Sequence, residues 1–157
     1  MINRQRSLLA ALAISATTFV SITLLEDYVE VAVPPVKGDV CTNGFGTTTG
    51  VKCGDKTTPP KALARALTDV QKFEGAIKKC VTVPLHQHEY DAYVSLTYNI
   101  GEGAFCRSTL VKKLNAGDYS GACEQILVWD KFKGKPLRGL TNRRQKEYEQ
   151  CIGKTGS

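Results

Sequence analysis

Residues 26–48 read EDYVEVAVPPVKGDVCTNGFGTT, and this stretch decides how the rest of the chain is interpreted. β-branched and proline residues fill its centre, so a helix that carries Glu26 must end before an extended segment begins. Asn43-Gly44 is typical of a hairpin turn, and we therefore expect Asp39 and Thr42 on or beside a tight β-turn. Two carboxylates and a hydroxyl then lie on separate elements, as acid-assisted hydrolysis of a glycosidic bond requires. The plain alternative is a helix-to-hairpin junction with solvated acids.

Three further motifs follow this stretch in a fixed order. They are SLTYNIG at residues 95–101, GAF and STL at residues 103–105 and 108–110, and GL, RR and E at residues 139–140, 143–144 and 147. Together with Thr-x-Gly-x-Gly at residues 42–46, they resemble the phage-type lysozymes of glycoside hydrolase family 24. Within that family the chain is most similar to the lambdoid endolysins that carry a signal anchor. The resemblance extends from about residue 25 to residue 151.

The resemblance implies an α+β, lysozyme-like fold, with a small β-hairpin lobe, a larger helical lobe and a cleft between them. It also implies an inverting reaction without metal ion or cofactor. The bond cleaved is the β-1,4 bond between N-acetylmuramic acid and N-acetylglucosamine in peptidoglycan, which leads to lysis of the host cell. Glu26 would be the general acid, and Asp39 with Thr42 would position or activate water.

The resemblance also implies contacts to the saccharide beyond the catalytic groups. The expected contacts are Asn99, Phe105, Ser108 and Thr109. Structural capping of the helix ends is the alternative role for these residues.

The second acid is where this sequence departs from the family pattern. The usual Glu-x8-Asp-x5-Thr spacing would place an aspartate at Pro35, where no acid exists. Thr42 lies sixteen residues after Glu26, one more than the common spacing, so a one-residue insertion makes Asp39 the nearest acid. Glu30 is the other option. A non-catalytic peptidoglycan-binding protein on the same fold is therefore the alternative function, and cationic membrane disruption is a third.

Residues 8–25 form an apolar segment of eighteen residues without a charge, preceded by Arg4 and Arg6. As one helix it would be about 27 Å long, just enough to cross a hydrocarbon core. The two arginines before the apolar segment indicate export with the N-terminus in the cytoplasm. Because alanine, serine and threonine make the segment weakly apolar and Glu26 follows without a spacer, we expect a signal anchor at residues 1–25. It would hold the chain in the host inner membrane and later release it into the periplasm. A cleaved signal peptide is the alternative.

Residues 26–157 would then form one catalytic domain, a monomer whose partner is peptidoglycan. Their ordinary share of apolar and charged residues, 42% and 23% in the whole chain, suits a domain with its own core. A net charge of +6 favours polyanionic partners. However, zinc-finger, phosphate-binding and dinucleotide motifs are absent from the sequence, which argues against nucleic-acid and nucleotide-dependent classes.

Six cysteines in an exported protein predict disulfide bonds. Cys41 and Cys53 flank the expected hairpin and could face each other across two antiparallel strands. Six cysteines allow fifteen complete pairings; with Cys41 joined to Cys53, the pairs Cys80 with Cys106 and Cys123 with Cys151 would each bracket helical sequence. No Cys-x-x-Cys pair, which would suit a thiolate metal site, occurs.

Helical periodicity dominates the rest of the chain. The expected helices cover residues 61–79, 86–100, 108–114, 119–129 and 142–151, and residues 154–157 are expected to be a loose tail. Pro59-Pro60 suits the start of the first helix, and Gly101 suits the end of the second.

Overall fold

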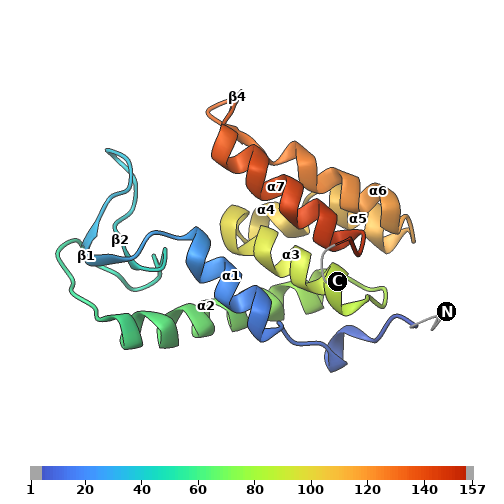
Figure 1. Ribbon diagram of the computed structural model, residues 1–157, viewed down its shortest axis with the longest axis horizontal. Coiled ribbons are helices and arrows are strands. Elements are labelled where there is room, and N and C mark those ends of the chain that lie inside the picture. The colour runs from blue at the N-terminus through green and yellow to red at the C-terminus, as the bar shows by residue number, and fades with distance from the viewer. Residues whose placement is uncertain (1–4, 155–157) are drawn as a thin grey trace. The chain divides into compact units, whose positions relative to one another are not determined.

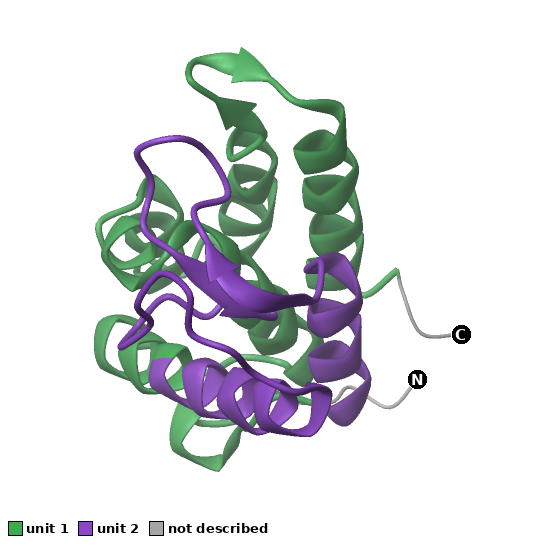
Figure 2. Ribbon diagram, turned by 90° about the vertical axis from the view of Figure 1, so that its left-hand side faces the viewer, with its two compact units in different colours: residues 1–15, 73–157 green, residues 16–72 purple. Residues whose placement is uncertain are grey.

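The computed structural model describes residues 5–154, which form mainly helices with two short antiparallel sheets (Figure 1). Arg4 of the predicted anchor and residues 155–157 of the predicted tail lie outside this range. The chain divides into two compact units (Figure 2). Residues 16–72 form one, called here the small unit, and the described residues up to 15 and from 73 onward form the other, called the helical unit.

The small unit contains α1 (Ala16–Leu25), β1 (Val29–Val33), β2 (Thr42–Gly44) and the first part of α2 (Pro59–Cys80). β1 and β2 are antiparallel, with Val29 opposite Gly44 and Val33 opposite Thr42. The predicted change from helix to extended chain after Glu26 is therefore confirmed, since α1 ends one residue before it.

Both edges of β1 are hydrogen-bonded. One edge pairs with β2. On the other edge, the amide of Ala32 donates to the Asp55 carbonyl (2.8 Å), and the amide of Gly54 donates to the Ala32 carbonyl (2.9 Å). The Thr57 amide donates to the Glu30 carbonyl at 3.0 Å. β1 is thus an internal strand with few unpaired backbone groups, which holds the segment between Glu26 and the hairpin in place.

Close packing against α2 fixes the end of β2. Gly44 has φ +60°, and a Cβ at this position would lie 3.0 Å from the Cβ of Ala62. Ala62 is itself buried. The strand and the helix approach each other at a contact that only a glycine facing a small residue permits.

The helical unit contains the larger part of the chain. Its elements are the 3-10 helix η1 (Leu9–Ala11), the end of α2, α3 (Gln87–Ile100), α4 (Glu102–Cys106), α5 (Thr109–Asn115), α6 (Tyr119–Gln125), the 3-10 helix η2 (Ile126–Val128), β3 (Lys131–Phe132), β4 (Lys135–Pro136) and α7 (Arg138–Cys151). Residues 89–97 of α3 are all buried, so α3 is the central helix of this unit. Polar residues on so buried a helix must have partners within the protein.

A buried ion-pair network joins α3 to α7. Arg144 is fully buried, and its Nε lies 2.7 Å from Oε2 of Glu147. The other oxygen of Glu147 accepts hydrogen bonds from the Ser95 hydroxyl at 2.7 Å and from Nε of Arg143 at 3.2 Å. The RR and E residues of the third motif are thus the interior link between two helices, because a buried charge is tolerated only when paired and hydrogen-bonded.

The segment predicted as one helix over residues 8–25 is not continuous. It comprises η1, an extended stretch at residues 12–15, and α1. The Ile14 amide donates to Oε1 of Glu74 (2.6 Å), and the Ser15 amide donates to Oδ1 of Asp91 (3.0 Å). These amides bind carboxylates in place of helical carbonyls, which accounts for the break. Within residues 5–154, no helix has the length and apolar character needed to cross a membrane.

The other predicted helices are confirmed, with ends displaced by a few residues. The last helix begins at Arg138, about one turn before the predicted start, and the end of the predicted helix at 119–129 tightens into η2. Three elements were not predicted, namely α4 and the two strands of the β3–β4 hairpin.

The predicted cysteine pairs are confirmed. Each of the six cysteines lies within the described range, and they pair as Cys41–Cys53, Cys80–Cys106 and Cys123–Cys151. The Cα–Cα distances of 5.3, 5.6 and 5.7 Å suit disulfide bonds. The first bond closes the loop that carries Thr42, and the third joins α6 to α7.

Peptide mapping of the exported protein without reduction should recover Cys41 linked to Cys53. Cys53→Ser should lower the free energy of unfolding by about 3 kcal/mol, because the chain-entropy model assigns this value to a loop of about a dozen residues. The double variant Cys41→Ser/Cys53→Ser is the control and should be no less stable than the single variant. Recovery of both cysteines as alkylated free thiols would contradict the pairing.

Candidate active site

The candidate acid Glu26 is half-buried and directly follows α1. Its carboxylate lies against Gly46, because a Cβ at Gly46 would be 3.2 Å from Glu26 Oε2. Gly46 also has φ +79°, a conformation that other residues adopt at a cost. The glycine-rich turn and the acid are therefore in close contact, and only glycine allows this approach without displacing the carboxylate.

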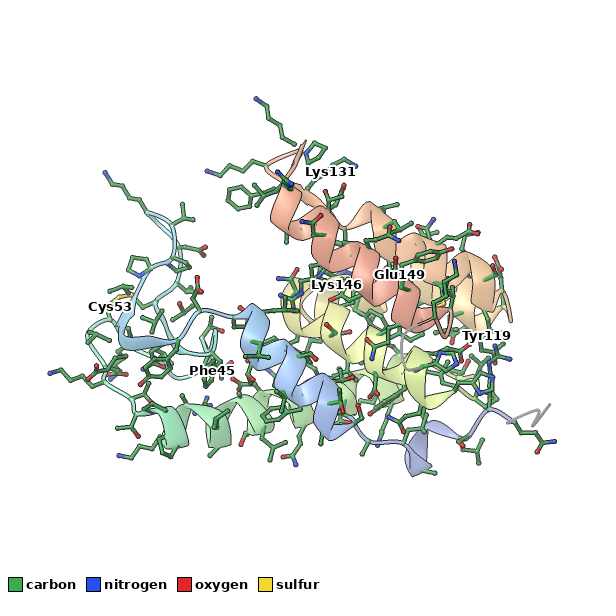
Figure 3. The ribbon with its side chains drawn as sticks, viewed as in Figure 1. Phe45, Cys53, Tyr119, Lys131, Lys146 and Glu149 are labelled. Carbon is green, nitrogen blue, oxygen red and sulfur yellow. A yellow bond between two sulfur atoms is a disulfide. The ribbon has the colours of Figure 1, made fainter. Side chains whose placement is uncertain are left out.

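A second contact ties the segment after Glu26 to the same turn. The rings of Tyr28 and Phe45 are 5.6 Å apart and tilted by 51°, a favourable aromatic arrangement (Phe45 is labelled in Figure 3). On its other side Glu26 is fixed by α1, whose Ile22 is 1% exposed. The position of the acid thus depends on the chain both before and after it.

Thr42 is half-buried and begins β2, directly before the turn. The backbones of Asn43 and Thr47 exchange two hydrogen bonds, at 3.2 and 3.0 Å, which close the turn. The Thr47 hydroxyl donates to Oδ2 of Asp69 on α2 at 2.7 Å, and Asp69 lies 3.5 Å from Nε of Arg65. The turn beside Glu26 is therefore anchored to α2.

Sequence reasoning missed Thr47 and Asp69. Thr47 directly follows the Thr-x-Gly-x-Gly motif, and Asp69 occurs on a predicted helix with other charged residues. The place of Thr47 directly after the glycine turn was the available signal, and the structure shows that Thr47 is 3% exposed, so its hydroxyl needs a partner within the protein. Both are positioning residues in this geometry, since they hold the turn and not the acid itself.

The two candidates for the second acid are both exposed. Asp39 follows a turn in which its amide donates to the Val36 carbonyl at 2.9 Å, and its Oδ1 accepts from the Val40 amide at 3.0 Å. Glu30 lies on β1. Asp39 thus belongs to the loop between the strands that also contains the extra residue, whereas Glu30 has the fixed backbone of an internal strand.

Two of the four predicted saccharide contacts have structural roles. Phe105 is fully buried, with its ring 5.9 Å from that of Tyr93, so it packs in the core and is not available to a ligand in this structure. Ser108 is the N-cap of α5: its hydroxyl accepts from the Val111 amide at 3.2 Å and donates to the Phe105 carbonyl at 2.6 Å. Capping, the alternative given for this turn, therefore describes Ser108 in this structure.

The other two predicted contacts, Asn99 and Thr109, are exposed. Oδ1 of Asn99 accepts a hydrogen bond from Nη1 of buried Arg144 at 2.9 Å. Arg144 is itself fixed by its ion pair with Glu147, so this hydrogen bond holds the Asn99 amide in one orientation.

A helical majority, small antiparallel sheets and an acid at the end of a helix define a lysozyme-like protein. The sequence model of the family described as "Phage lysozyme" matches residues 25–147, and the chain belongs to this family. This confirms the resemblance seen in the motifs at residues 42–46, 95–110 and 139–147.

The chain is similar to known phage proteins over most of its length. It is 46% identical over 110 residues to an endolysin of Acyrthosiphon pisum secondary endosymbiont phage 1. The aligned residues cover 68% of this chain and 75% of that protein. It is 36% identical over 111 residues to a SAR-endolysin of Pseudomonas phage phiKMV, covering 68% and 69%. Its structure is similar to that of an endolysin from Escherichia coli O157:H7 phage FAHEc1, with a TM-score of 0.77 and 34% identity over 94% of this chain and 98% of that one.

Gly46→Ala should separate the contact with Glu26 from ordinary backbone strain. Gly54→Ala is the matched control, because Gly54 has φ +90° and open space around a Cβ. Both variants should lose about 1 kcal/mol of stability, the cost of a left-handed alanine. Only Gly46→Ala should also lower the rate of clearing of permeabilised cells, by at least about tenfold, because it displaces the carboxylate. Equal loss of activity in both variants would contradict this contact.

Proposed function

We propose that this phage lysozyme is an endolysin, a muramidase that hydrolyses the β-1,4 bond between N-acetylmuramic acid and N-acetylglucosamine in peptidoglycan and so lyses the host cell. The observation that carries the proposal is the family match over residues 25–147, which includes Glu26 and its glycine turn. The named relatives are an endolysin and a SAR-endolysin, which supports the same activity.

Glu26 is proposed as the general acid that protonates the leaving oxygen of the glycosidic bond. The contact with Gly46 supports this role, since it holds the half-buried carboxylate in one place at the end of α1, and proton transfer depends on such positioning. Asp39, together with Thr42, would activate or position the water that attacks from the opposite face of the sugar ring, as in an inverting hydrolysis. Glu30 is the alternative to Asp39. Asn99 and Thr109 remain the proposed saccharide contacts.

Glu26→Gln and Thr42→Ala should each lower the clearing of outer-membrane-permeabilised cells at least about a hundredfold, the typical contribution of a proton-transferring or water-positioning group. Asp39→Asn should cost more activity than Glu30→Gln. Circular dichroism and thermal melting should show that each variant remains folded.

Wild-type clearing by a folded Glu26→Gln protein would refute the role of Glu26. A wild-type protein that binds sacculi but does not clear them, with Glu26→Gln behaving identically, would instead identify a non-catalytic peptidoglycan-binding protein.

Residues 1–25 are further proposed to act as a signal anchor before the enzyme is released, with residues 26–157 as the catalytic domain in the periplasm. Relatives from Pseudomonas phage phiKMV, Escherichia phage Mu and Enterobacteria phage P21 are named SAR-endolysins, which supports this proposal. In the anchored form Arg6 would lie on the cytoplasmic side of the membrane and Glu26 at its periplasmic surface.

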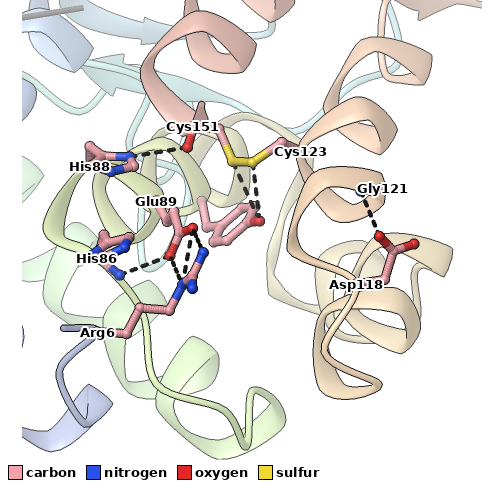
Figure 4. Close-up of a disulfide and its surroundings, with 9 residues drawn as sticks. Arg6, His86, His88, Glu89, Asp118, Gly121, Cys123 and Cys151 are labelled. Carbon is pink, nitrogen blue, oxygen red and sulfur yellow. Dashed lines mark hydrogen bonds and ion pairs between the residues drawn. A yellow bond between two sulfur atoms is a disulfide. The ribbon is translucent and has the colours of Figure 1, made fainter. Parts of the chain in front are cut away.

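In the folded chain, Arg6 and Ser7 contact other protein residues instead of a membrane. Nη2 of Arg6 donates to Glu89 Oε1 at 2.8 Å (Figure 4). The Arg6 guanidinium also lies 3.6 Å from the centroid of the Tyr119 ring. The hydrogen bond to Glu89 raises the pKa of Arg6 further above its usual value. Ser7 pairs with Leu85 through two backbone hydrogen bonds of 2.8 and 2.9 Å. A chain whose Arg6 is still in the cytoplasm cannot make these contacts.

The buried carboxylate of Glu74 also binds the N-terminal segment. Oε1 of Glu74 accepts from both the Ile14 amide (2.6 Å) and the Tyr90 hydroxyl (2.8 Å). Burial and the bond to Glu74 raise the pKa of Tyr90 well above its usual range. Nζ of Lys78 donates to the Leu12 carbonyl at 2.6 Å. The released segment therefore replaces lipid contacts by specific polar contacts, and we propose that the anchored form is inactive until it does so.

Thr17→Leu/Ser21→Leu should keep the protein in the membrane fraction and delay lysis, because both substitutions make the anchor more apolar. Both side chains are exposed in the folded chain, so the refolded variant should clear cells at the wild-type rate, which is the control.

An ionophore should hasten release of the wild type, since collapse of the membrane potential removes about 2.3 kcal/mol per charge per 100 mV. Native protein that starts near residue 24 would show a cleaved signal peptide and contradict the anchor.

A further inference from the structure

The β3–β4 hairpin has no buried residue. Residues 131–139, KFKGKPLRG, are all exposed, and the hairpin projects beyond the end of α7 (Figure 1). Phe132 is 50% exposed and Leu137 is 51% exposed, as is Val128 just before the hairpin. Isolated apolar side chains at a surface are common, but this small hairpin exposes two within six residues, and the ring contact described for Phe132 is with a cation, Nζ of Lys133, 5.4 Å from the ring centroid.

The hairpin also concentrates positive charge. Its cations are Lys131, Lys133 and Lys135, and Arg138 follows at the start of α7. The one acid in residues 129–139 is Asp130, which accepts from the Thr141 hydroxyl at 3.2 Å and lies 4.0 Å from Nζ of Lys131. The acid is thus held at the base, and the outer part of the hairpin carries cations alone (Lys131 is labelled in Figure 3).

Apolar and cationic side chains share a face of this hairpin. Phe132 pairs with Lys135, and opposite residues of an antiparallel pair lie on the same side. Leu137 lies two residues beyond Lys135, so by strand alternation it is on this side too. Its amide donates to the Asp130 carbonyl at 2.9 Å, which extends the ladder to this position.

The tip of the hairpin retains a lysine at a strained position. Lys133 has φ +50° and Gly134 has φ +80°, which together make the two-residue turn that favours Asn-Gly. Lys133 is the one non-glycine residue in the described range with a positive φ. A residue that is unfavourable for the turn but adds charge to the tip points to a role outside folding.

We propose that the β3–β4 hairpin docks onto an anionic phospholipid surface. Phe132 and Leu137 enter the boundary between headgroups and acyl chains, while Lys135 on the same face and Lys133 at the tip bind headgroup phosphates. Interfacial segments combine apolar insertion and basic charge in this way. A carboxylated wall polymer would neutralise the lysines but leave both apolar side chains in water, so the lipid surface accounts for more of the observed features.

Co-sedimentation of the purified full chain with vesicles tests this surface. The vesicles are phosphatidylethanolamine with phosphatidylglycerol, compared with phosphatidylcholine alone. Lys133→Asn and Lys135→Gln should each weaken binding to the anionic vesicles about fivefold, the usual effect of one basic residue near such a surface. Phe132→Ser should weaken it at least as much. Lys146→Gln, which removes an exposed lysine of α7, is the matched control and should change binding less than twofold.

Lys133→Asn separates binding from folding. Asparagine suits the turn better than lysine, so the melting temperature should stay the same or rise while vesicle binding falls. Equal vesicle binding by the wild type and the hairpin variants would overturn the proposal. Unchanged vesicle binding with weakened binding to purified sacculi would overturn it too, by assigning the hairpin to the wall.

Discussion

The contact between Glu26 and Gly46 is the constraint on which the rest of the small unit depends. It requires α1 to form up to the residue before the acid, and it requires the turn after β2 to be fixed by Thr47 and Asp69. The internal position of β1 and the disulfide at Cys41 limit movement of the chain between these two points. These contacts position the Glu26 carboxylate although it follows the end of a helix, as its proposed role in proton transfer requires.

The same residues that form α1 are the second half of the proposed anchor, and the two roles make opposite demands. A membrane helix should be apolar all round, whereas α1 buries Thr18, Ile22 and Thr23 and leaves Leu24 80% exposed. A more apolar segment would favour the bilayer, and a more polar one would not insert. The weak hydrophobicity of residues 8–25 suits the proposed anchor, since such a segment would have to be stable in both environments.

Local patterns in the sequence predicted the helices and the hairpin, because capping, turn and periodicity signals act over a few residues. The break at residues 12–15 could not be predicted, since it depends on Glu74 and Asp91, about sixty and seventy-six residues away. Phe105 was expected beside the saccharide because the matching stretch of the family lies along the saccharide groove, but its ring packs against Tyr93. The inserted residue between β1 and β2 left Asp39 and Glu30 both open as the second acid, because loop length does not determine where a side chain points.

The central claim is that Glu26 and its partners add water across the bond at the muramic acid. Digestion of purified sacculi in ¹⁸O-labelled water, followed by mass spectrometry of the muropeptides, tests this directly. The account predicts N-acetylmuramic acid at the reducing end, with one labelled oxygen at its anomeric carbon. An anhydro sugar, or N-acetylglucosamine at the reducing end, would contradict it.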